Sequence, residues 1–316
     1  VELNLPPLII EGAEADDTIA SIIEQHKSDF DAIEIVSGDK DLYNMLYKNV
    51  VMLRSKKGVS DFLEIDEAWV KKEIGITREQ VDAFASGSFA KAVAAQQAGF
   101  HAGEIVPVVT ESFELSGYAT RGIKLQGKLT EVAQDTHARI SPVEVLAKLR
   151  SVYPGGVQTG GNSSALTDAA VAALVASGPA TREWGAQTGG KPLARLAAAA
   201  AVGVPPEIMG IGPAPAIRLL LERAGLTLAD IARFEVNEAQ GAQTLAVQRE
   251  LGLDVAKLNV KGGAIALGHP LAATGVRLTI TVARQLKEIG ARWGVASACV
   301  GGGQGMALLV ENPDAS

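Results

Sequence analysis

The sequence predicts an α/β protein made of two unlike parts, and three observations lead to that prediction. Short apolar runs alternate with segments whose apolar residues recur at helical spacing. The first 78 residues carry 16 acidic and 9 basic side chains, whereas the remainder carries 20 of each, so the net charge of −7 lies in the first part. Of the 34 glycines, 4 fall in those 78 residues. Such a break in composition marks a domain boundary, here placed between residues 78 and 79.

The first part has a strand–helix–strand–helix–strand order. Its predicted strands are the apolar runs 7–10, 32–36 and 50–53. Helical spacing follows Glu14 and again follows Asp41, between these runs. Because a β-α-β unit places its strands side by side and parallel, residues 1–78 are expected to form a partial parallel sheet with helices packed on it.

The second part continues the alternation of helices and strands. Its predicted helices are 81–100, 143–149, a segment from 168, 213–225, a segment after 239 and 271–289. Its predicted strands are 104–108, 231–236, 293–298 and 306–310, and residues 196–203 fit either type. Residues 110–140 are mixed and polar, so we expect a loop-rich region there. A further boundary between 204 and 205 would separate the glycine-rich last third.

Composition excludes several classes of protein. No apolar run approaches the ~18 residues of a membrane helix, and no basic-then-apolar leader opens the chain. The single cysteine excludes an intramolecular disulfide framework and fits a reducing compartment. We therefore expect a cytoplasmic protein without a membrane partner. The first residue, Val1, hints at a processed, truncated or assembled chain.

Two acidic motifs distinguish the first part. Glu14-Ala15-Asp16-Asp17 opens a helix, and Ser37-Gly38-Asp39-Lys40-Asp41 follows the next strand. Together they resemble the 5′-nuclease (flap endonuclease) family, which includes the 5′-exonuclease domain of bacterial DNA polymerases. The resemblance implies that five carboxylates match the family's ligands for two divalent metals: Glu14, Asp16, Asp17, Asp39 and Asp41. Clustered hard oxygens suit Mg²⁺. The structural alternative is that Asp16 and Asp17 cap a helix.

Nuclease activity is nevertheless not expected. The family's first metal-binding aspartate would precede Val1, and its later Gly-Asp-x-x-Asp-Asn segment and helix-hairpin-helix should follow Gln80 but do not. A net acidic segment is also a poor binder of polyanions. We expect the five carboxylates to be vestigial, and neither Mg²⁺ nor nucleic acid to be a partner. Metal-dependent 5′-nuclease activity on DNA is kept as an alternative function.

Three residues of the last third stand at strand ends beside glycine-rich turns. Asn237 follows the strand 231–236, His269 lies in the loop 262–270, and Cys299 follows the strand 293–298. Ligand sites of α/β folds gather at such ends. Taken alone, a lone cysteine is usually an inert small hydrophobe, a histidine before proline can be a core residue, and the following glycines can form a tight turn. Only their joint spacing favours a site.

Motifs in the second part resemble the thiolase (acetyl-CoA acyltransferase) family closely and in family order. These motifs are Asp82-Ala83-Phe84-Ala85, Glu104-Ile105-Val106-Pro107-Val108, Gly161-Asn162-Ser163-Ser164, Met209-Gly210-Ile211-Gly212-Pro213, Asn237-Glu238-Ala239, Gly268-His269-Pro270-Leu271 and Cys299-Val300-Gly301-Gly302-Gly303-Gln304-Gly305. The resemblance covers about residues 79–312. It implies a layered α/β/α fold built from two similar halves, of which 205–316 is complete and 79–204 is incomplete.

The resemblance also implies the role of each site residue. Cys299 would match the base that removes the α-proton of an acyl-CoA, and we expect glycine N–H groups and an imidazole to lower its pKa. His269 would match the histidine that activates the nucleophile and donates to the thioester oxygen. Asn237 would hold a water in that oxyanion site. The Gly301 N–H would line a second oxyanion hole, and Ser164 would contact coenzyme A. The structural alternative for Asn162 and Ser163 is a turn with a helix cap.

One departure from the family decides what activity is expected. The acyl-accepting cysteine of thiolases lies upstream of the Asp-Ala-Phe-Ala element, where this chain carries nuclease-like sequence and no cysteine. We expect a chimera with the function of a thiolase-type acyltransferase impaired by that loss, limited to acyl-CoA binding and α-proton exchange. Coenzyme A esters would be the substrate, no cofactor would be required, and a homodimer is implied by the family. A catalytically inert chimera is the further alternative.

Overall fold

The structure is a computed structural model that describes residues 33–36, 50–55, 62–65, 75–113, 121–125, 128–152 and 155–315. Several predictions about the first part fall outside these residues. They are the strand at 7–10, the helices after Glu14 and Asp41, and the five carboxylates Glu14, Asp16, Asp17, Asp39 and Asp41.

A small sheet forms from three described strands of the first part, β1 (Ile33–Val36), β2 (Val50–Ser55) and β3 (Phe62–Ile65). β1 and β2 run parallel, with Ile33 opposite Val50. This confirms the predicted parallel pairing. β3 adds to β2 in the antiparallel direction, a pairing that we did not predict.

The main sheet has four strands in the order β8-β11-β10-β9. Their bounds are β8 Arg195–Gly203, β9 Arg233–Val236, β10 Trp293–Val300 and β11 Gln304–Glu311. β9 and β10 are parallel, and the other two pairings are antiparallel. The ambiguous segment 196–203 is therefore a strand, because β11 supplies its ladder of hydrogen bonds. Cys299 lies inside β10, opposite Gly305, and not in the turn where we expected it.

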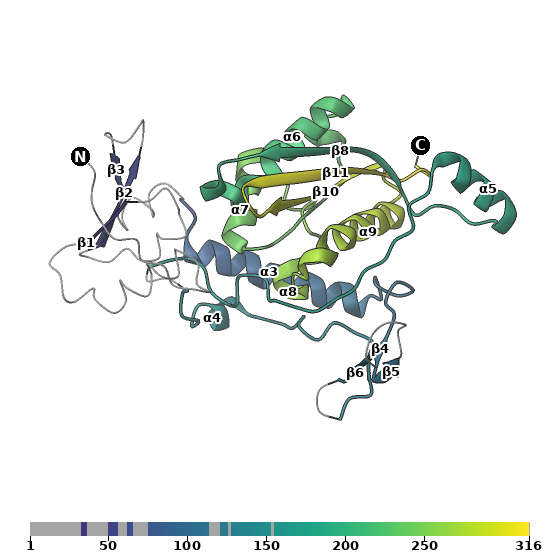
Figure 1. The fold of residues 1–316 in the computed structure, drawn as a ribbon, viewed down its shortest axis with the longest axis horizontal. Coiled ribbons are helices and arrows are strands. Elements are labelled where there is room, and N and C mark those ends of the chain that lie inside the picture. Colours follow the sequence, from purple (N-terminus) through teal and green to yellow (C-terminus); the bar gives the residue numbers. More distant parts are fainter. Residues whose placement is uncertain are drawn as a thin grey trace.

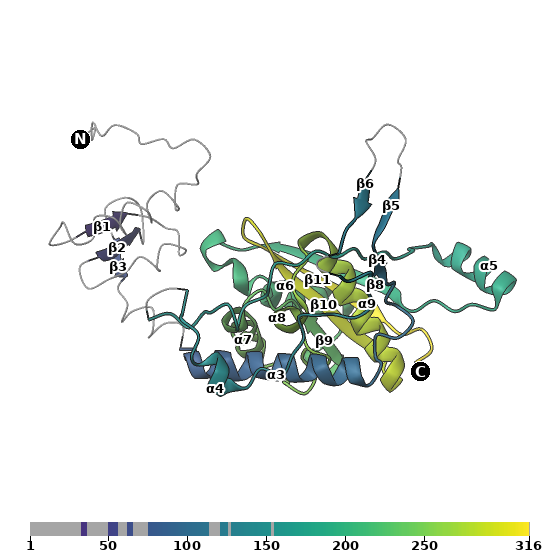
Figure 2. The ribbon, with the colours of Figure 1, turned by 90° about the horizontal axis from the view of Figure 1, so that it is seen from below.

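Helices cover both faces of this sheet, which confirms the expected α/β/α layering (Figures 1 and 2). α6 (Pro213–Ala224) packs on the face that presents Phe234 and Val295. α9 (Leu271–Ile289) packs on the opposite face, which presents Ala296 and Val310. Because side chains alternate along a strand, each face collects its own apolar set. The predicted bounds of both helices are confirmed.

The described residues form further helices. They are α3 Arg78–Gln97, α4 Val143–Leu146, α5 Gly178–Thr188, α7 Gly241–Leu251, α8 Ala264–Leu267 and the 3₁₀ turns η2 Pro206–Ile211 and η3 Leu228–Asp230. α3 begins at a capping box, in which the Gln80 backbone N–H donates to Thr77 Oγ1 and Gln80 Oε1 accepts from the Thr77 backbone N–H. Within the described ranges, no helix is long and apolar enough to cross a bilayer.

Two predicted elements are wrong, and both lie in strongly exposed segments. In place of a strand over 104–108, only Val108–Val109 (β4) pairs, and the Val106 side chain is 83% exposed. In place of a helix from Asp168, the chain has no regular secondary structure as far as Ser177, and Leu174 is fully exposed. No described element covers these side chains, so burial does not stabilise the pattern that predicted them. Short strands β5 (Glu111–Phe113), β6 (Arg121–Ile123) and β7 (Glu131–Val132) complete the loop-rich region that was predicted.

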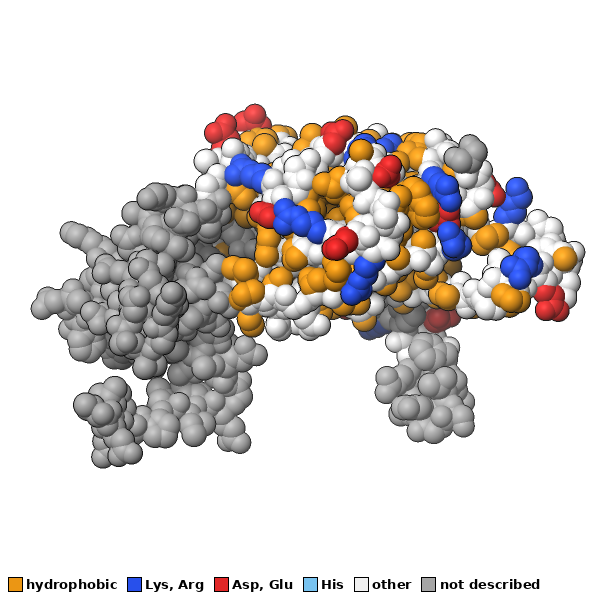
Figure 3. All heavy atoms as spheres, turned by 90° about the horizontal axis from the view of Figure 1, so that it is seen from above, with side chains coloured by type: hydrophobic (Ala, Val, Ile, Leu, Met, Phe, Trp, Pro, Cys, Tyr) orange, Lys and Arg blue, Asp and Glu red, His pale blue; other side chains and the backbone are white. Residues whose placement is uncertain are grey.

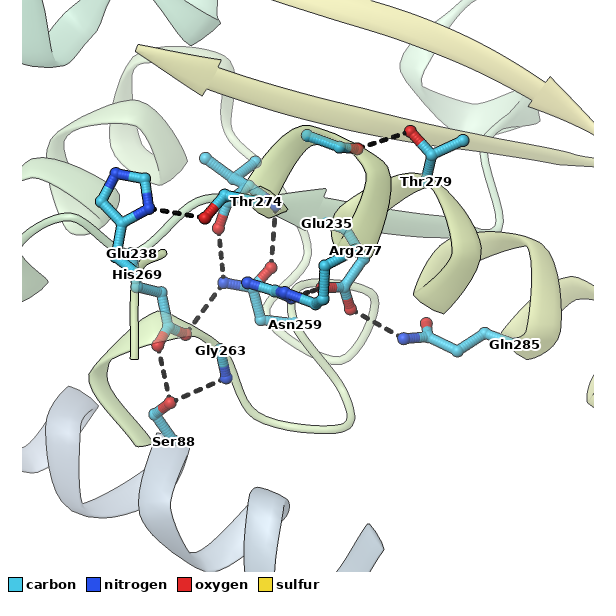
Figure 4. Close-up of polar contacts among 12 residues, drawn as sticks. Ser88, Glu235, Glu238, Asn259, Gly263, His269, Thr274, Arg277, Thr279 and Gln285 are labelled. Carbon is cyan, nitrogen blue, oxygen red and sulfur yellow. Dashed lines mark hydrogen bonds and ion pairs between the residues drawn. The ribbon is translucent and has the colours of Figure 1, made fainter. Parts of the chain in front are cut away.

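A buried polar layer lies between β9 and α9 (Figure 4). Glu235 is fully buried, accepts a hydrogen bond of 2.7 Å from Gln285 Nε2 and faces the Arg277 guanidinium at 3.4 Å. Burial raises the pKa of Glu235 to about 7, although Arg277 and Gln285 act in the opposite direction. Removing a carboxylate from water disfavours its charged form.

This shift predicts a loss of stability as pH rises. Between about 4.5 and about 7 the folded protein holds a proton on Glu235 that the unfolded chain has released, so the free energy of unfolding falls. The loss reaches at most about 3.5 kcal/mol, because each pKa unit is worth about 1.4 kcal/mol. Urea unfolding at several pH values should show this slope in the wild type and a smaller slope in Glu235→Gln.

Glu311→Gln provides the control, because the pKa of Glu311 is shifted in the opposite direction to that of Glu235. Burial acts to raise the pKa of Glu311, but hydrogen bonds from Arg195 and Arg292 outweigh it and lower that pKa. The substitution should therefore cost stability at neutral pH and little in acid, while leaving the slope between 4.5 and 7 in place. An unchanged slope in Glu235→Gln would contradict the assignment.

Candidate functional site

Asn237 and His269 meet at the carboxyl end of β9. Asn237 is the residue after this strand and is 1% exposed, and its N–H donates to the Ser297 carbonyl of β10 at 2.9 Å. His269 stands two residues before α9, and its N–H donates to the Ala165 carbonyl at 3.0 Å. The side chains approach with Asn237 Nδ2 3.3 Å from His269 Nε2. Two of the predicted site residues are thus in direct contact.

Thr274 determines which nitrogen of His269 carries the proton. His269 Nδ1 lies 2.7 Å from Thr274 Oγ1 (Figure 4). That hydroxyl donates to the Pro270 carbonyl at 3.0 Å. Because a hydroxyl has one proton to give, Thr274 accepts from Nδ1–H. Nε2 then keeps its lone pair and accepts from the Asn237 amide. Thr274 was missed in the sequence; its position one turn into the helix after His269 was the available signal.

The electrostatic surroundings keep His269 neutral. Burial lowers the pKa of His269, and the positive charge of Arg277 lowers it further. A neutral imidazole with an unprotonated Nε2 can take a proton from a thiol, and after doing so it can donate to an oxyanion. The Asn237 Oδ1 atom is buried and has no hydrogen-bond partner among the described residues.

Cys299 occupies the adjacent strand at the same edge of the sheet, but its state differs from expectation. Burial raises the pKa of the Cys299 thiol above its ordinary value, whereas we expected a lowered pKa. Among the described residues, no hydrogen bond joins the thiol to His269 or Asn237. Desolvation decides the direction, because it outweighs the hydrogen bond from the Cys299 backbone N–H, which acts to lower the pKa. Cys299 is therefore a thiol at neutral pH in this structure.

The glycines after Cys299 form the tight turn between β10 and β11. Gly302 and Gly303 have φ angles of +84° and +87°, which side chains rarely adopt. Gly303 also lies against the Val204 carbonyl, so that no space is left for a side chain at this position. Gly301 is exposed and its surroundings are open. The tight-turn alternative is therefore correct for Gly302 and Gly303, while Gly301 remains free to present its N–H.

The segment 163–167 joins the two loops that carry Asn237 and His269. Ser163 forms an isolated bridge with Gln240, and both the N–H and the hydroxyl of Ser164 donate to the Ala239 carbonyl, at 3.0 and 3.1 Å. Just beyond, a cavity of about 420 Å³ is lined by Leu166, Thr167, Asp168, His269 and Leu271. Ser164 thus lies beside the site, with its hydroxyl already engaged by the backbone.

Asn162 is a structural residue of a turn, as the alternative held, but no helix follows that it could cap. It is fully buried, and its Nδ2 donates to Asp82 Oδ1 at 2.8 Å and to the Val157 carbonyl at 2.9 Å. Asp82 also pairs with Arg78 at 2.7 Å. The Asp-Ala-Phe-Ala and Gly-Asn-Ser-Ser motifs therefore meet to fix α3 against the loop.

Comparisons with known families divide the chain in a similar way. Residues 190–312 match the family model for the C-terminal domain of thiolase, and residues 65–178 match that for its N-terminal domain. Residues 1–75 match the N-terminal resolvase-like domain of 5′-3′ exonuclease. No group of acidic, histidine or cysteine side chains able to hold a metal occurs in the part of the chain that the structure describes.

Relatives among characterised proteins are thiolases. A beta-ketoadipyl-CoA thiolase of Acinetobacter baylyi is 44% identical over 246 residues, which are 77% of this chain and 57% of the relative. An acetyl-CoA acetyltransferase of Syntrophomonas wolfei is 42% identical over 242 residues, 75% of this chain and 56% of the relative. The chain therefore spans less than two thirds of the length of these relatives.

Solved structures of thiolases also resemble this chain. Human mitochondrial 3-ketoacyl-CoA thiolase in complex with CoA is 34% identical with a TM-score of 0.65, over 82% of this chain and 65% of that one. The acetyl-CoA acetyltransferase of Bacillus anthracis is 32% identical with a TM-score of 0.63, over 83% of this chain and 71% of that one. Over residues 65–312 the chain belongs to the thiolase family, and residues 1–75 in front of it match the 5′-3′ exonuclease family.

Proposed function

We propose that the thiolase part binds acyl-CoA thioesters and exchanges their α-protons, with Cys299 as the base and Asn237 and His269 facing the thioester oxygen. The contact between Asn237 Nδ2 and His269 Nε2 carries this proposal. It places an amide donor and a neutral imidazole at one point on the carboxyl edge of the sheet, where α/β folds bind ligands. The human relative in complex with CoA supports coenzyme A esters as the ligand class.

The proposed exchange is a reversible proton transfer. The Cys299 thiolate removes a proton from the carbon next to the thioester carbonyl, and the electron pair of that C–H bond moves onto the carbonyl oxygen. The Asn237 amide, through a water that it would hold, stabilises the enolate oxygen, and the Gly301 N–H would line a second oxyanion hole. The thiol then exchanges its proton with solvent and returns a solvent proton to carbon. No electrons are gained or lost.

Complete acyl transfer is outside this proposal. Thiolysis and Claisen condensation require one thiolate to hold the acyl group while a second group moves the α-proton. Cys299 is the single cysteine of the chain, so it cannot serve in both roles. His269 would activate a thiol nucleophile such as that of coenzyme A, and Ser164 would contact the coenzyme A moiety. Assembly as a homodimer, implied by the family, and a cytoplasmic location, suggested by the single cysteine, belong to the same proposal.

Deuterium incorporation at the acetyl methyl of acetyl-CoA in D₂O, followed by NMR, tests the role of Cys299. Exchange should vanish in Cys299→Ala and in the isosteric Cys299→Ser, whose hydroxyl does not ionise in this range. Because burial raises the pKa of the thiol, the wild-type rate should rise about tenfold per pH unit between 7 and 9.

Thermal melting and coenzyme A binding by both variants provide the controls for folding. Exchange that persists in folded Cys299→Ala, or a wild-type rate that is flat with pH, would exclude Cys299 as the base. If the wild type binds acetyl-CoA without exchange, the protein is a binding module only.

For residues 1–75 we propose no 5′-nuclease activity. Their acidic excess repels a polyanion. On the face of the thiolase part that Figure 3 colours, charged side chains of both signs are interspersed with hydrophobic ones, without an extended basic area. We expect no Mg²⁺-dependent cleavage of 5′-flap DNA above background. Cleavage that is abolished both by a chelator and by the double substitution Asp39→Asn and Asp41→Asn would show that the carboxylates are active.

A further inference from the structure

Glu238, the residue after Asn237, is buried where three segments of the chain meet (Figure 4). Its side chain is 1% exposed. Oε2 accepts from Ser88 Oγ on α3 at 2.6 Å and from the Ile265 N–H on α8 at 3.3 Å. Oε1 accepts from Asn259 Nδ2 at 2.9 Å. A buried carboxylate is costly unless donors compensate it, and here three donors do so.

The surrounding backbone leaves room for this carboxylate and for little else. The Gly263 N–H donates to Ser88 Oγ at 3.0 Å, and a Cβ atom on Gly263 would overlap the Glu238 carboxylate. Gly262, at φ +80°, lies so close to α3 that a Cβ atom there would stand 2.7 Å from Ala92 N. The loop at Gly262 and Gly263 therefore packs closely against α3 and against the Glu238 side chain.

Asn259 connects the same carboxylate to the sheet. Its Oδ1 accepts from the Val236 N–H at 2.9 Å, and its Nδ2 donates to the Val236 carbonyl at 2.8 Å. Asn259 has a φ of +45°, a conformation in which few residues other than Gly, Asn and Asp are found. The side chain therefore holds the last residue of β9 while it also holds Glu238.

We infer that Glu238 is a positioning residue that sets the distance between the Asn237 and His269 side chains. Glu238 directly follows Asn237 in the chain. Its hydrogen bond from the Ile265 N–H fixes the short helix α8, and Gly268 connects the end of this helix to His269. The bond from Ser88 extends the same constraint to α3, 150 residues away in sequence. The inference rests on the proposed function for its catalytic meaning, since Glu238 itself does not face the thioester.

Glu238→Gln tests the inference with a side chain of the same shape. An amide NH₂ would have to face Asn259 Nδ2 or the Ile265 N–H, both donors, so at least one hydrogen bond is lost. We expect exchange turnover to fall about tenfold or more with a change in KM of less than about threefold, because a misplacement of about 1 Å can cost about 100-fold. In ¹⁵N-histidine spectra, His269 should leave the Nδ1–H tautomer for a mixture of both.

Glu311→Gln is the matched control. Glu311 is 6% exposed and is paired with Arg195 and Arg292, but it lies at the far end of the β10–β11 ladder from Cys299. It should keep the wild-type exchange rate and the wild-type His269 spectrum. Ser88→Ala removes one donor and keeps the carboxylate. It should change the exchange turnover and the His269 spectrum in the same direction as Glu238→Gln, and it replaces Glu238→Gln as the test if that variant does not fold.

The spectrum separates the inference from the function on which it rests. Absence of exchange in the wild type would refute the proposed function, while the His269 nitrogen shifts would still report whether Glu238 positions the ring. Wild-type shifts in folded Glu238→Gln, or in folded Ser88→Ala if the former does not fold, would overturn the inference. Equal shifts in Glu311→Gln and Glu238→Gln would overturn it as well.

Discussion

The four-stranded sheet β8-β11-β10-β9 presents apolar side chains on both faces, and both faces have to be removed from water. α6 covers one face over Phe234 and Val295, and α9 covers the other over Ala296 and Val310. Once both helices are in place, the carboxyl ends of the parallel pair β9 and β10 lie side by side. Asn237 and Cys299 stand at those ends, and α9 brings His269 to the same edge. The candidate site is therefore a consequence of how the sheet is covered.

Polar groups inside this packing are located where they also act on the site. Arg277 of α9 pairs with buried Glu235 of β9, and the same positive charge lowers the pKa of His269. On the other side of Asn237, Glu238 accepts hydrogen bonds from α3, from α8 and from Asn259. Glu235 and Glu238 thus connect the end of β9 to different helices through hydrogen bonds and an ion pair.

Elements with a complete local pattern were predictable from the sequence. α6 and α9 were located to within a residue or two, because each has a helical apolar face, a proline near its start and a glycine after its end. Gly225 and Gly290 adopt the left-handed conformation that ends these helices. The strand at 104–108 and the helix from 168 failed for the opposite reason. Their apolar patterns are real, but no described element packs on them, so Val106 and Leu174 remain in water.

By itself the sequence determined the α/β class, the change of family near residue 78 and the three residues Asn237, His269 and Cys299 as site candidates, because motifs and spacing are local properties. Only the tertiary structure decided that Asn237 meets His269 at 3.3 Å, that Thr274 orients the imidazole and that Asn162 is structural. It also reversed the expected direction of the Cys299 pKa shift. A pKa and a tautomer depend on burial and on partners that come from distant parts of the chain, and no local pattern of residues contains them.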